Sequence, residues 1–292
     1  MNTGRAKIAL IFAFLSLNIF LIYNLMQPDF EGLCFPGMHE NQLQQIEKFI
    51  QFSGYSLEVP LDQIARSGDF ITVSPYPVDR SLIAKEAYSV IYGEKVDIYH
   101  CPGKQVKFHR GGLTEIQYVP GIPLDLSGPK DEELKSKLEA FLKDRFSFQQ
   151  LKLDLIQEGS PGERIITYTQ NLEGSGLYSS FVRATINEGC LVSIEYFWLN
   201  ILKRPQEHLI GMITSAEAVQ KLVKELGFSA GPRCITGLDL GFYSPEYEAE
   251  QWDVPPVWRI IIDHRQIYYI NAFTGYLEHD LNINEDDRSA KY

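Results

Sequence analysis

One apolar run near the start of the chain constrains the fold more than any other feature. Residues Ile8–Met26 contain no Asp, Glu, Lys or Arg. As an α-helix this run is about 28 Å long at ~1.5 Å per residue, close to the ~30 Å thickness of a bilayer core. Because a buried helix of a soluble domain rarely needs so long an uncharged run, we expect a transmembrane helix at 8–26.

The flanks of this run indicate its orientation. Arg5 and Lys7 precede it, whereas Asp29 and Glu31 come after it. Positive charge stays on the cytoplasmic side, so we expect a single-pass protein of the cell membrane with a cytoplasmic N-terminus and the bulk of the chain outside. A cleaved signal peptide is the alternative, but the run exceeds the usual ~7–15 residues and no small-x-small cleavage site comes after it.

Charge and size bound the exported part. The 292 residues include 27 Lys and Arg against 38 Asp and Glu, a formal net charge of −11. This acidic balance, without a basic stripe, excludes nucleic acid as a partner. With 45% hydrophobic residues, the exported part can bury a core, and at ~150 residues per domain it forms one large or two modest domains.

Cysteine usage leaves two interpretations open. The four cysteines are Cys34, Cys101, Cys190 and Cys234. An even number outside the cytoplasm permits two disulfides. Separate thiols that pack as small apolar groups fit the wide spacing equally well.

Apolar periodicity predicts an α+β fold of antiparallel sheets, each packed by helices. A first helix is expected over Asn41–Phe52, where Leu43, Ile46 and Ile50 share one face. Strands are expected at Leu57–Val59, Phe70–Val73, Val96–Tyr99, Val106–Phe108 and Ile116–Val119. Ser81–Tyr92 fits either a helix or a strand, and the prolines and glycines of 120–129 predict a loop at a domain boundary.

Beyond this loop the sequence predicts a helix and then strands, twice. The first helix covers Asp131–Arg145, and the second begins at Thr214, whose spacing to Glu217 is that of a capping box, and ends at Gly227. The expected strands are Arg164–Gln170, Tyr178–Ile186, Cys190–Trp198, Cys234–Tyr243, Val257–Asp263 and Ile267–Ala272. The expected parts are a cytoplasmic arm (1–7), a transmembrane helix (8–26), a linker (27–39), two α+β domains (40–126 and 127–282) and a flexible acidic tail (283–292).

Catalytic signatures are missing from the sequence. It contains no G-x-S-x-G, H-E-x-x-H, Walker or G-x-G-x-x-G motif. His100 and Cys101 are only sequence neighbours, Ser127 and Lys130 flank a Gly-Pro turn, and Glu246 and Glu248 lie in a polar loop with Tyr243, Tyr247 and Trp252. We expect a protein that is not an enzyme and has no cofactor, metal or small-molecule substrate. A hydrolase with an unrecognised site is the remaining enzymatic alternative, and the aromatic loop is a candidate protein contact.

The last predicted hairpin carries the structural residues. Trp258, Ile260 and Ile262 alternate onto one face, as do Tyr268 and Ile270 on the partner strand. Asn271–Gly275 then leaves the strand in a turn, where Gly275 is free to adopt a positive φ. The residues expected to be structural are Trp258, Tyr268, Tyr269, Asn271 and Gly275.

Both ends of the chain resemble one family. Arg5-Ala6-Lys7 with Phe12–Tyr23 after it is similar to the anchor of YycI proteins, and Val257–Ile260 with Ile267–Gly275 resembles the last hairpin of that family and of PepSY-type domains. Tyr276 stands after Thr274-Gly275 where the family usually has Glu. The resemblance implies a non-enzymatic regulator of the cell-wall sensor histidine kinase WalK (YycG) of a two-component system, acting beside a YycH partner. A PepSY-type extracellular peptidase inhibitor or peptide-binding module is the alternative.

The resemblance also gives the anchor a role in partner binding. At 100° per residue one stripe of the helix holds Ala9, Ala13, Ser16 and Phe20, with Asn24 at its edge and Asn18 nearly opposite. Small residues let helices approach closely, and an amide in lipid prefers a partner. These faces are hypothesised to contact the kinase span and the YycH-like regulator; alternatively, the bilayer merely tolerates the residues.

Overall fold

The structure is a computed structural model of the chain. It describes residues 18, 40–61, 64, 66–124, 131–146, 148, 150–204, 210–245 and 249–278. Apart from Asn18, which is helical, the expected cytoplasmic arm, transmembrane helix, linker and acidic tail lie outside these residues. Within the described part of the chain, no helix has the length and apolar character needed to cross a bilayer.

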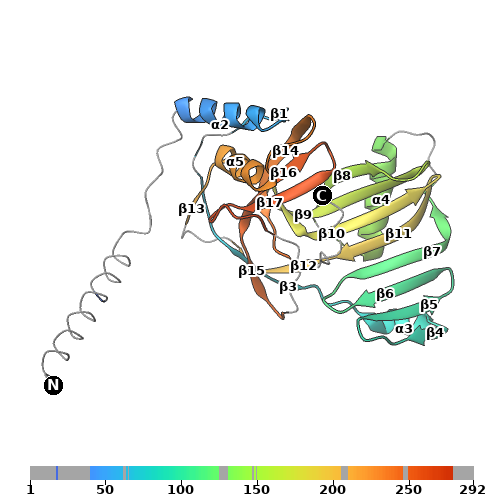
Figure 1. Cartoon of the computed structure of the whole chain (residues 1–292). Coiled ribbons are helices and arrows are strands. Elements are labelled where there is room, and N and C mark those ends of the chain that lie inside the picture. The colour runs from blue at the N-terminus through green and yellow to red at the C-terminus, as the bar shows by residue number, and fades with distance from the viewer. Residues whose placement is uncertain are drawn as a thin grey trace, which may run out of the picture.

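The described part is an α+β fold made mostly of sheet (Figure 1). Its helices are α2 (Glu40–Phe52), α3 (Arg80–Glu86), α4 (Asp131–Phe146) and α5 (Ser215–Leu226). The first seven strands are β1 (Tyr55–Leu57), β2 (Arg66–Gly68), β3 (Ile71–Pro75), β4 (Ser89–Ile91), β5 (Val96–Cys101), β6 (Lys104–His109) and β7 (Thr114–Pro123). The later strands are β8 (Leu151–Glu158), β9 (Glu163–Leu172), β10 (Ser175–Asn187), β11 (Cys190–Phe197), β12 (Leu199–Lys203), β13 (Ile210–Met212), β14 (Arg233–Phe242), β15 (Trp252–Val254), β16 (Pro256–Ile262) and β17 (Gln266–Asn271).

Twelve strands form one sheet with two parts. Its main path runs β17-β16-β14-β10-β11-β7-β6-β5-β4, with β1 beside β14 and with β9 and then β8 beside β10. We name β4–β11 the α4 sheet and β1, β14, β16 and β17 the α5 sheet. A parallel pairing of Leu177 with Phe242 joins the two parts. The helix-then-strands order predicted twice is therefore confirmed by α4 with β8–β11 and by α5 with β14, β16 and β17.

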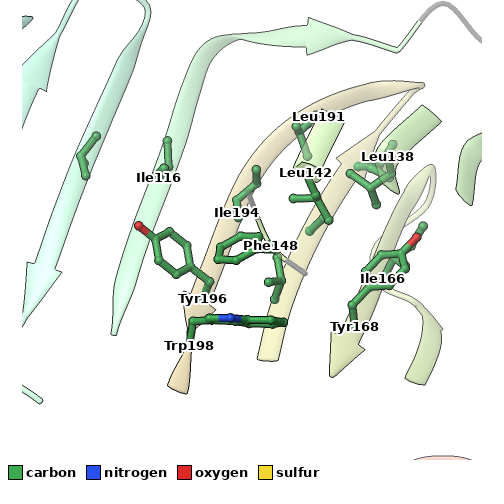
Figure 2. Packing of buried hydrophobic residues seen from close by; sticks show 14 of the residues in the cluster. Ile116, Leu138, Leu142, Phe148, Ile166, Tyr168, Leu191, Ile194, Tyr196 and Trp198 are labelled. Carbon is green, nitrogen blue, oxygen red and sulfur yellow. The ribbon is translucent and has the colours of Figure 1, made fainter. Parts of the chain in front are cut away.

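The α4 sheet buries its core against α4. Leu138 and Leu142, one turn apart on α4, are fully buried against strand residues such as Ile166 and Ile194 (Figure 2). Leu134 completes the apolar stripe that the sequence predicted. Apolar burial of this kind is the main stabilising term of a fold.

The second core lies between α5, α2 and the α5 sheet. The Thr214 hydroxyl accepts the Glu217 backbone N–H at 3.2 Å, and the Glu217 carboxylate accepts the Thr214 N–H at 2.8 Å, so the capping box is confirmed. Gly227 closes the helix with a φ of 76°. On the α5 sheet, buried Trp258 and Ile260 belong to the same core as α2.

The expected boundary between residues 126 and 127 does not separate two sheets or two cores. Strand β7 pairs with β11, and β1 pairs with β14, so each expected domain supplies strands to the other. The α4 core likewise contains Ile116 from one side of the boundary and Ile194 from the other. Long-range pairing of this kind is invisible to local periodicity.

Local differences from the expected elements have local causes. Ser81–Tyr92 contains both alternatives, α3 and then β4. The proline-rich start of the expected loop instead continues β7, pairing Ile122 with Leu191 across a register shift. A bulge of this kind accommodates proline, which cannot donate to the ladder. The sequence patterns gave no prediction of β8, which pairs antiparallel with β9.

Candidate functional site

Trp258 and Tyr268 of the last hairpin pack in the α5 core. Trp258 is only 4% exposed, and its indole Nε1–H donates to the carbonyl of Ile213 at 2.9 Å. Tyr268 and Ile270 pack on the same core. The predicted alternation of this hairpin is confirmed.

The turn after β17 also forms as expected. The Asn271 side chain accepts the backbone N–H groups of Phe273 and Thr274 at 2.9 and 3.1 Å and donates to Glu278 at 2.7 Å. Gly275 has a φ of 73°, and its N–H donates to the Asn271 carbonyl at 2.7 Å. Both residues hold the turn.

Arg259 is a site that sequence reasoning missed. It is the only charged residue in β16, whose seven residues are all buried. Its guanidinium donates to Asp239 at 2.8 Å and to Asp154, and its Cζ lies 4.3 Å from the centre of the Tyr178 ring. The missed signal is a lone arginine inside an apolar strand, because a buried charge must be paired.

Aromatic rings surround this ion pair. Tyr269 stacks on Tyr243 with ring centres 3.8 Å apart, and Tyr178 lies 5.5 Å from Tyr269. Burial raises the pKa of Tyr178 and of Tyr269, so both phenols stay neutral. For Arg259, burial opposes the charge, but Tyr178, Asp154 and Asp239 outweigh it and raise the pKa.

We name Arg259, its partners Asp154 and Asp239, and the rings of Tyr178, Tyr243 and Tyr269 the arginine cluster. This cluster links the two parts of the sheet. Asp154 lies on β8 of the α4 sheet, whereas Arg259 and Asp239 lie on β16 and β14 of the α5 sheet. The Arg259 Nε–H is buried without a hydrogen-bond partner among the described residues. With a permanently charged cation and neutral phenols, the arrangement ties the two sheets together and contains no activated nucleophile.

The face of the α4 sheet opposite α4 is polar and hollowed. The hollow measures about 560 Å³ and is lined by residues of β6, β7, β9, β10 and β11. The Glu115 carboxylate accepts a hydrogen bond from Lys107 Nζ at 2.9 Å and another from His109 Nε2 at 2.7 Å. Glu115 lies directly opposite Glu195 on β11. Burial favours protonation of Glu115, but its interactions with Lys107 and His109 outweigh burial and lower the pKa of Glu115.

Among the described residues, His100 and Cys101 each have contacts of their own. Cys101 is buried, its thiol lies 3.8 Å from the carbonyl of Ile83, and burial raises its pKa. His100 instead contacts the Gln105 amide at 3.4 Å. Ser127, Lys130, Glu246, Tyr247 and Glu248 lie outside the described residues. Across the part of the chain with described side chains, no three His, Cys, Asp or Glu residues form a metal-binding group.

The cysteines and the aromatic loop have structural surroundings. Cys101, Cys190 and Cys234 are free thiols, and Cys34 lies outside the described residues. The indole of Trp252 donates to Ser244 at 2.9 Å. Because Tyr243 stacks on Tyr269, these two aromatics of the candidate contact loop are half-buried in packing.

An exposed apolar edge ends the α4 sheet. β4 is the last strand in the sheet order, at the end opposite β17 (Figure 1). Tyr88 is 74% exposed, Ile91 54% and Tyr92 75%. We name these three side chains, with strand β4, the β4 edge. Exposed aromatic groups beside an unpaired strand edge are typical of a protein-binding surface.

The anchor residues remain predictions. Ala9, Ala13, Ser16, Phe20 and Asn24 lie outside the described residues, as do the topology residues Arg5 and Lys7. Asn18 is described as helical.

Comparison with solved structures gives alignments over most of the chain. A protein from Eubacterium rectale ATCC 33656, described as uncharacterized, aligns with a TM-score of 0.52 at 10% identity, covering 83% of this chain and 99% of its own. The C-terminal domain of Bacillus megaterium YpeB aligns with a TM-score of 0.37 at 11% identity, covering 83% and 96%. Comparison with curated proteins gives no match.

The sequence also matches a model of one protein family. The match is to the YycI protein family and covers residues 38–273. This range takes in nearly every described residue, including both helix-plus-sheet parts, the arginine cluster and the β4 edge. The chain therefore belongs to the YycI family.

Proposed function

We propose that this protein is a non-enzymatic, membrane-anchored regulator of a WalK/YycG-like cell-wall sensor histidine kinase, acting with a YycH-like partner. The observation that carries the proposal is membership of the YycI family over residues 38–273. The uncharged run at 8–26, with Arg5 and Lys7 before it, supports a single-pass anchor and an extracytoplasmic location for the rest.

Outside the membrane, we assign partner contact to the β4 edge. A strand edge offers unpaired backbone N–H and C=O groups, and the exposed rings of Tyr88 and Tyr92 add apolar area to the same edge. Tyrosine is among the residues that dominate binding energy in protein interfaces. A strand of the YycH-like partner or of the kinase sensor domain fits such an edge.

Inside the membrane, the proposal uses the two faces of the anchor helix. Hydrogen bonds between transmembrane helices contribute ~0.6–2 kcal/mol, which biases a kinase equilibrium several-fold without holding a complex alone. We expect Asn18→Leu to leave insertion intact, shift kinase output and weaken one partnership. Ala13→Leu is expected to weaken the other.

Copurification of the full-length protein from membranes tests the proposal. Recovery of a histidine kinase supports it, and recovery of a protease alone would overturn it in favour of a peptidase inhibitor. Tyr88→Glu with Tyr92→Glu is expected to reduce kinase or YycH-like recovery. Tyr276→Glu is the matched control, because Tyr276 is 76% exposed and lies just after β17, at the opposite end of the sheet order.

Two further measurements separate the anchor from the exported part. A phosphatase reporter fused after Tyr292 is expected to be active outside the membrane, whereas activity only from a cytoplasmic reporter would refute the orientation. Replacing 8–26 with an unrelated apolar span should change kinase output. Unchanged output and copurification would move the whole interaction to the exported part.

A further inference from the structure

The hollow on the face of the α4 sheet away from α4 has the size of a ligand site. We name it the polar hollow. Its volume of about 560 Å³ lies within the ~300–1,000 Å³ that small-molecule sites occupy. Ile116 and Ile194 on its strands point the other way, into the α4 core (Figure 2). Because strand side chains alternate between faces, their neighbours Glu115, Gln117 and Glu195 point into the polar hollow.

Strand register aligns neutral hydrogen-bonding side chains in one row across the polar hollow. On β6, β7, β11 and β10 the paired residues are Gln105, Gln117, Ser193 and Thr185. Strands ~4.8 Å apart make this row ~14 Å long. The side chains of Gln117, Ser193 and Thr185 make no hydrogen bond to other described residues. The row therefore offers free donors and acceptors along its length.

A second row, two residues further along the same strands, is charged. It consists of Lys107, Glu115, Glu195 and Arg183. Lys107 Nζ donates to Glu115 at 2.9 Å, and the Arg183 guanidinium donates to Glu195 at 2.6 Å. The two ion pairs balance the charge of the row and hold its carboxylates in place. A carboxylate accepts about four hydrogen bonds, so both carboxylates keep free acceptor sites.

This charge arrangement disfavours an ionic ligand. An anion would meet three carboxylates in the lining, those of Glu115, Glu163 and Glu195. A cation could bind Glu115 or Glu195 only in competition with the cation that each carboxylate already holds. A neutral ligand leaves both ion pairs intact and adds hydrogen bonds to them.

Apolar and peptide ligands also fit the polar hollow poorly. Of its apolar lining residues, Ile116, Tyr118 and Ile194 pack with the α4 core, which leaves Val192. An extended peptide binds a sheet through main-chain hydrogen bonds at a free edge, but β6, β7, β10 and β11 are each paired on both sides. A saccharide needs neither an apolar surface nor a free edge, because each of its hydroxyl groups donates one hydrogen bond and accepts others.

We propose that the polar hollow binds a neutral saccharide. The Gln117 amide and the Ser193 hydroxyl exchange hydrogen bonds with its hydroxyl groups, and the carboxylates of Glu115 and Glu195 accept from them. Ion pairs and strand pairing fix these groups before the ligand arrives, which lowers the entropy lost on binding. This inference does not rest on the kinase-regulating function proposed above.

Ligand-observed saturation-transfer NMR on the full-length protein tests the class of ligand. The detergent must be zwitterionic and lack a sugar headgroup, and the probes are chitotriose and maltotriose. At least one probe is expected to bind, and its Kd should change less than about twofold over a tenfold rise in salt, because no charge on the ligand is paired. Failure of both probes to bind would overturn the proposal, as would a Kd that rises about tenfold with salt. Binding of an acetylated, amidated penta-alanine in place of both saccharides would also overturn it.

A pair of matched variants tests the location. Gln117→Ala is expected to weaken binding of the probe about fivefold or more, because it removes the central amide of the neutral row. Gln51→Ala is the control, since Gln51 is also an exposed glutamine but lies on α2, beside the α5 core. Both variants should melt with the wild type, because both side chains are exposed. Equal affinity of the two variants for the probe would refute the polar hollow as the site.

Discussion

Replacement of Arg259 by methionine tests most directly how the two parts of the sheet are held together. The side chains of Arg259 and Asp154 are 8% and 9% exposed, whereas that of Asp239 is 49% exposed. Arg259→Met leaves the Asp154 carboxylate buried without its cation, which costs about 3–5 kcal/mol of unfolding free energy. Asp239→Asn should cost under about 1 kcal/mol, because water solvates that half of the cluster.

The double variant Arg259→Met with Asp154→Leu separates pairing from packing. It removes both buried charges at similar volume, and such replacements are often neutral, so most of the stability lost in Arg259→Met should return. Urea unfolding of the purified protein, monitored by tryptophan fluorescence, measures all four stabilities. A double variant no more stable than Arg259→Met, or an Asp239→Asn variant as unstable as Arg259→Met, would refute the reasoning.

Three shorter predictions concern the core, the last turn and the charged face. Trp258→Ala should lower the unfolding free energy by about 3–5 kcal/mol. Trp258→Phe should lower it by less, because Phe keeps most of the buried ring and loses only the hydrogen bond to the Ile213 carbonyl. A melting temperature within a degree or two of wild type for Trp258→Ala would contradict this prediction. Gly275→Ala should lower the unfolding free energy measured by urea unfolding by about 1 kcal/mol, because the φ of 73° at this position favours glycine. An unchanged urea midpoint would show that the turn relaxes to accept alanine. The pKa of Glu115 is lowered below its ordinary 4.5, so its carboxylate stabilises the fold above that value and the effect disappears as the pH falls through the folded pKa. The difference in unfolding free energy between wild type and Glu115→Gln should therefore narrow on acidification below about pH 5. A difference independent of pH would count against the role of Lys107 and His109 in lowering this pKa.

Sequence alone predicted the elements whose cause is local. The apolar stripe of α4 and the capping box of α5 both lie within a few residues of the structure they specify, so their helices form where expected. The alternation of apolar residues likewise predicted strands β16 and β17. The positive φ of Gly275 agrees with the turn predicted after β17. Trp258, the main structural residue expected from the hairpin, is buried as predicted.

Tertiary structure decided what depends on partners far apart in the chain. Arg259 pairs with Asp154, which is 105 residues away in the sequence. The local sequence pattern of neither strand predicts that the two strands come together. The exposure of Tyr88 was equally unpredictable, because it depends on β4 being the last strand of the sheet. The expected two domains became one sheet for the same reason: β7 and β1 find their partners in the other half of the chain. Apolar periodicity in the sequence specifies which face of a helix or strand is buried. Which other helix or strand packs on that face depends on the free energy of long-range packing.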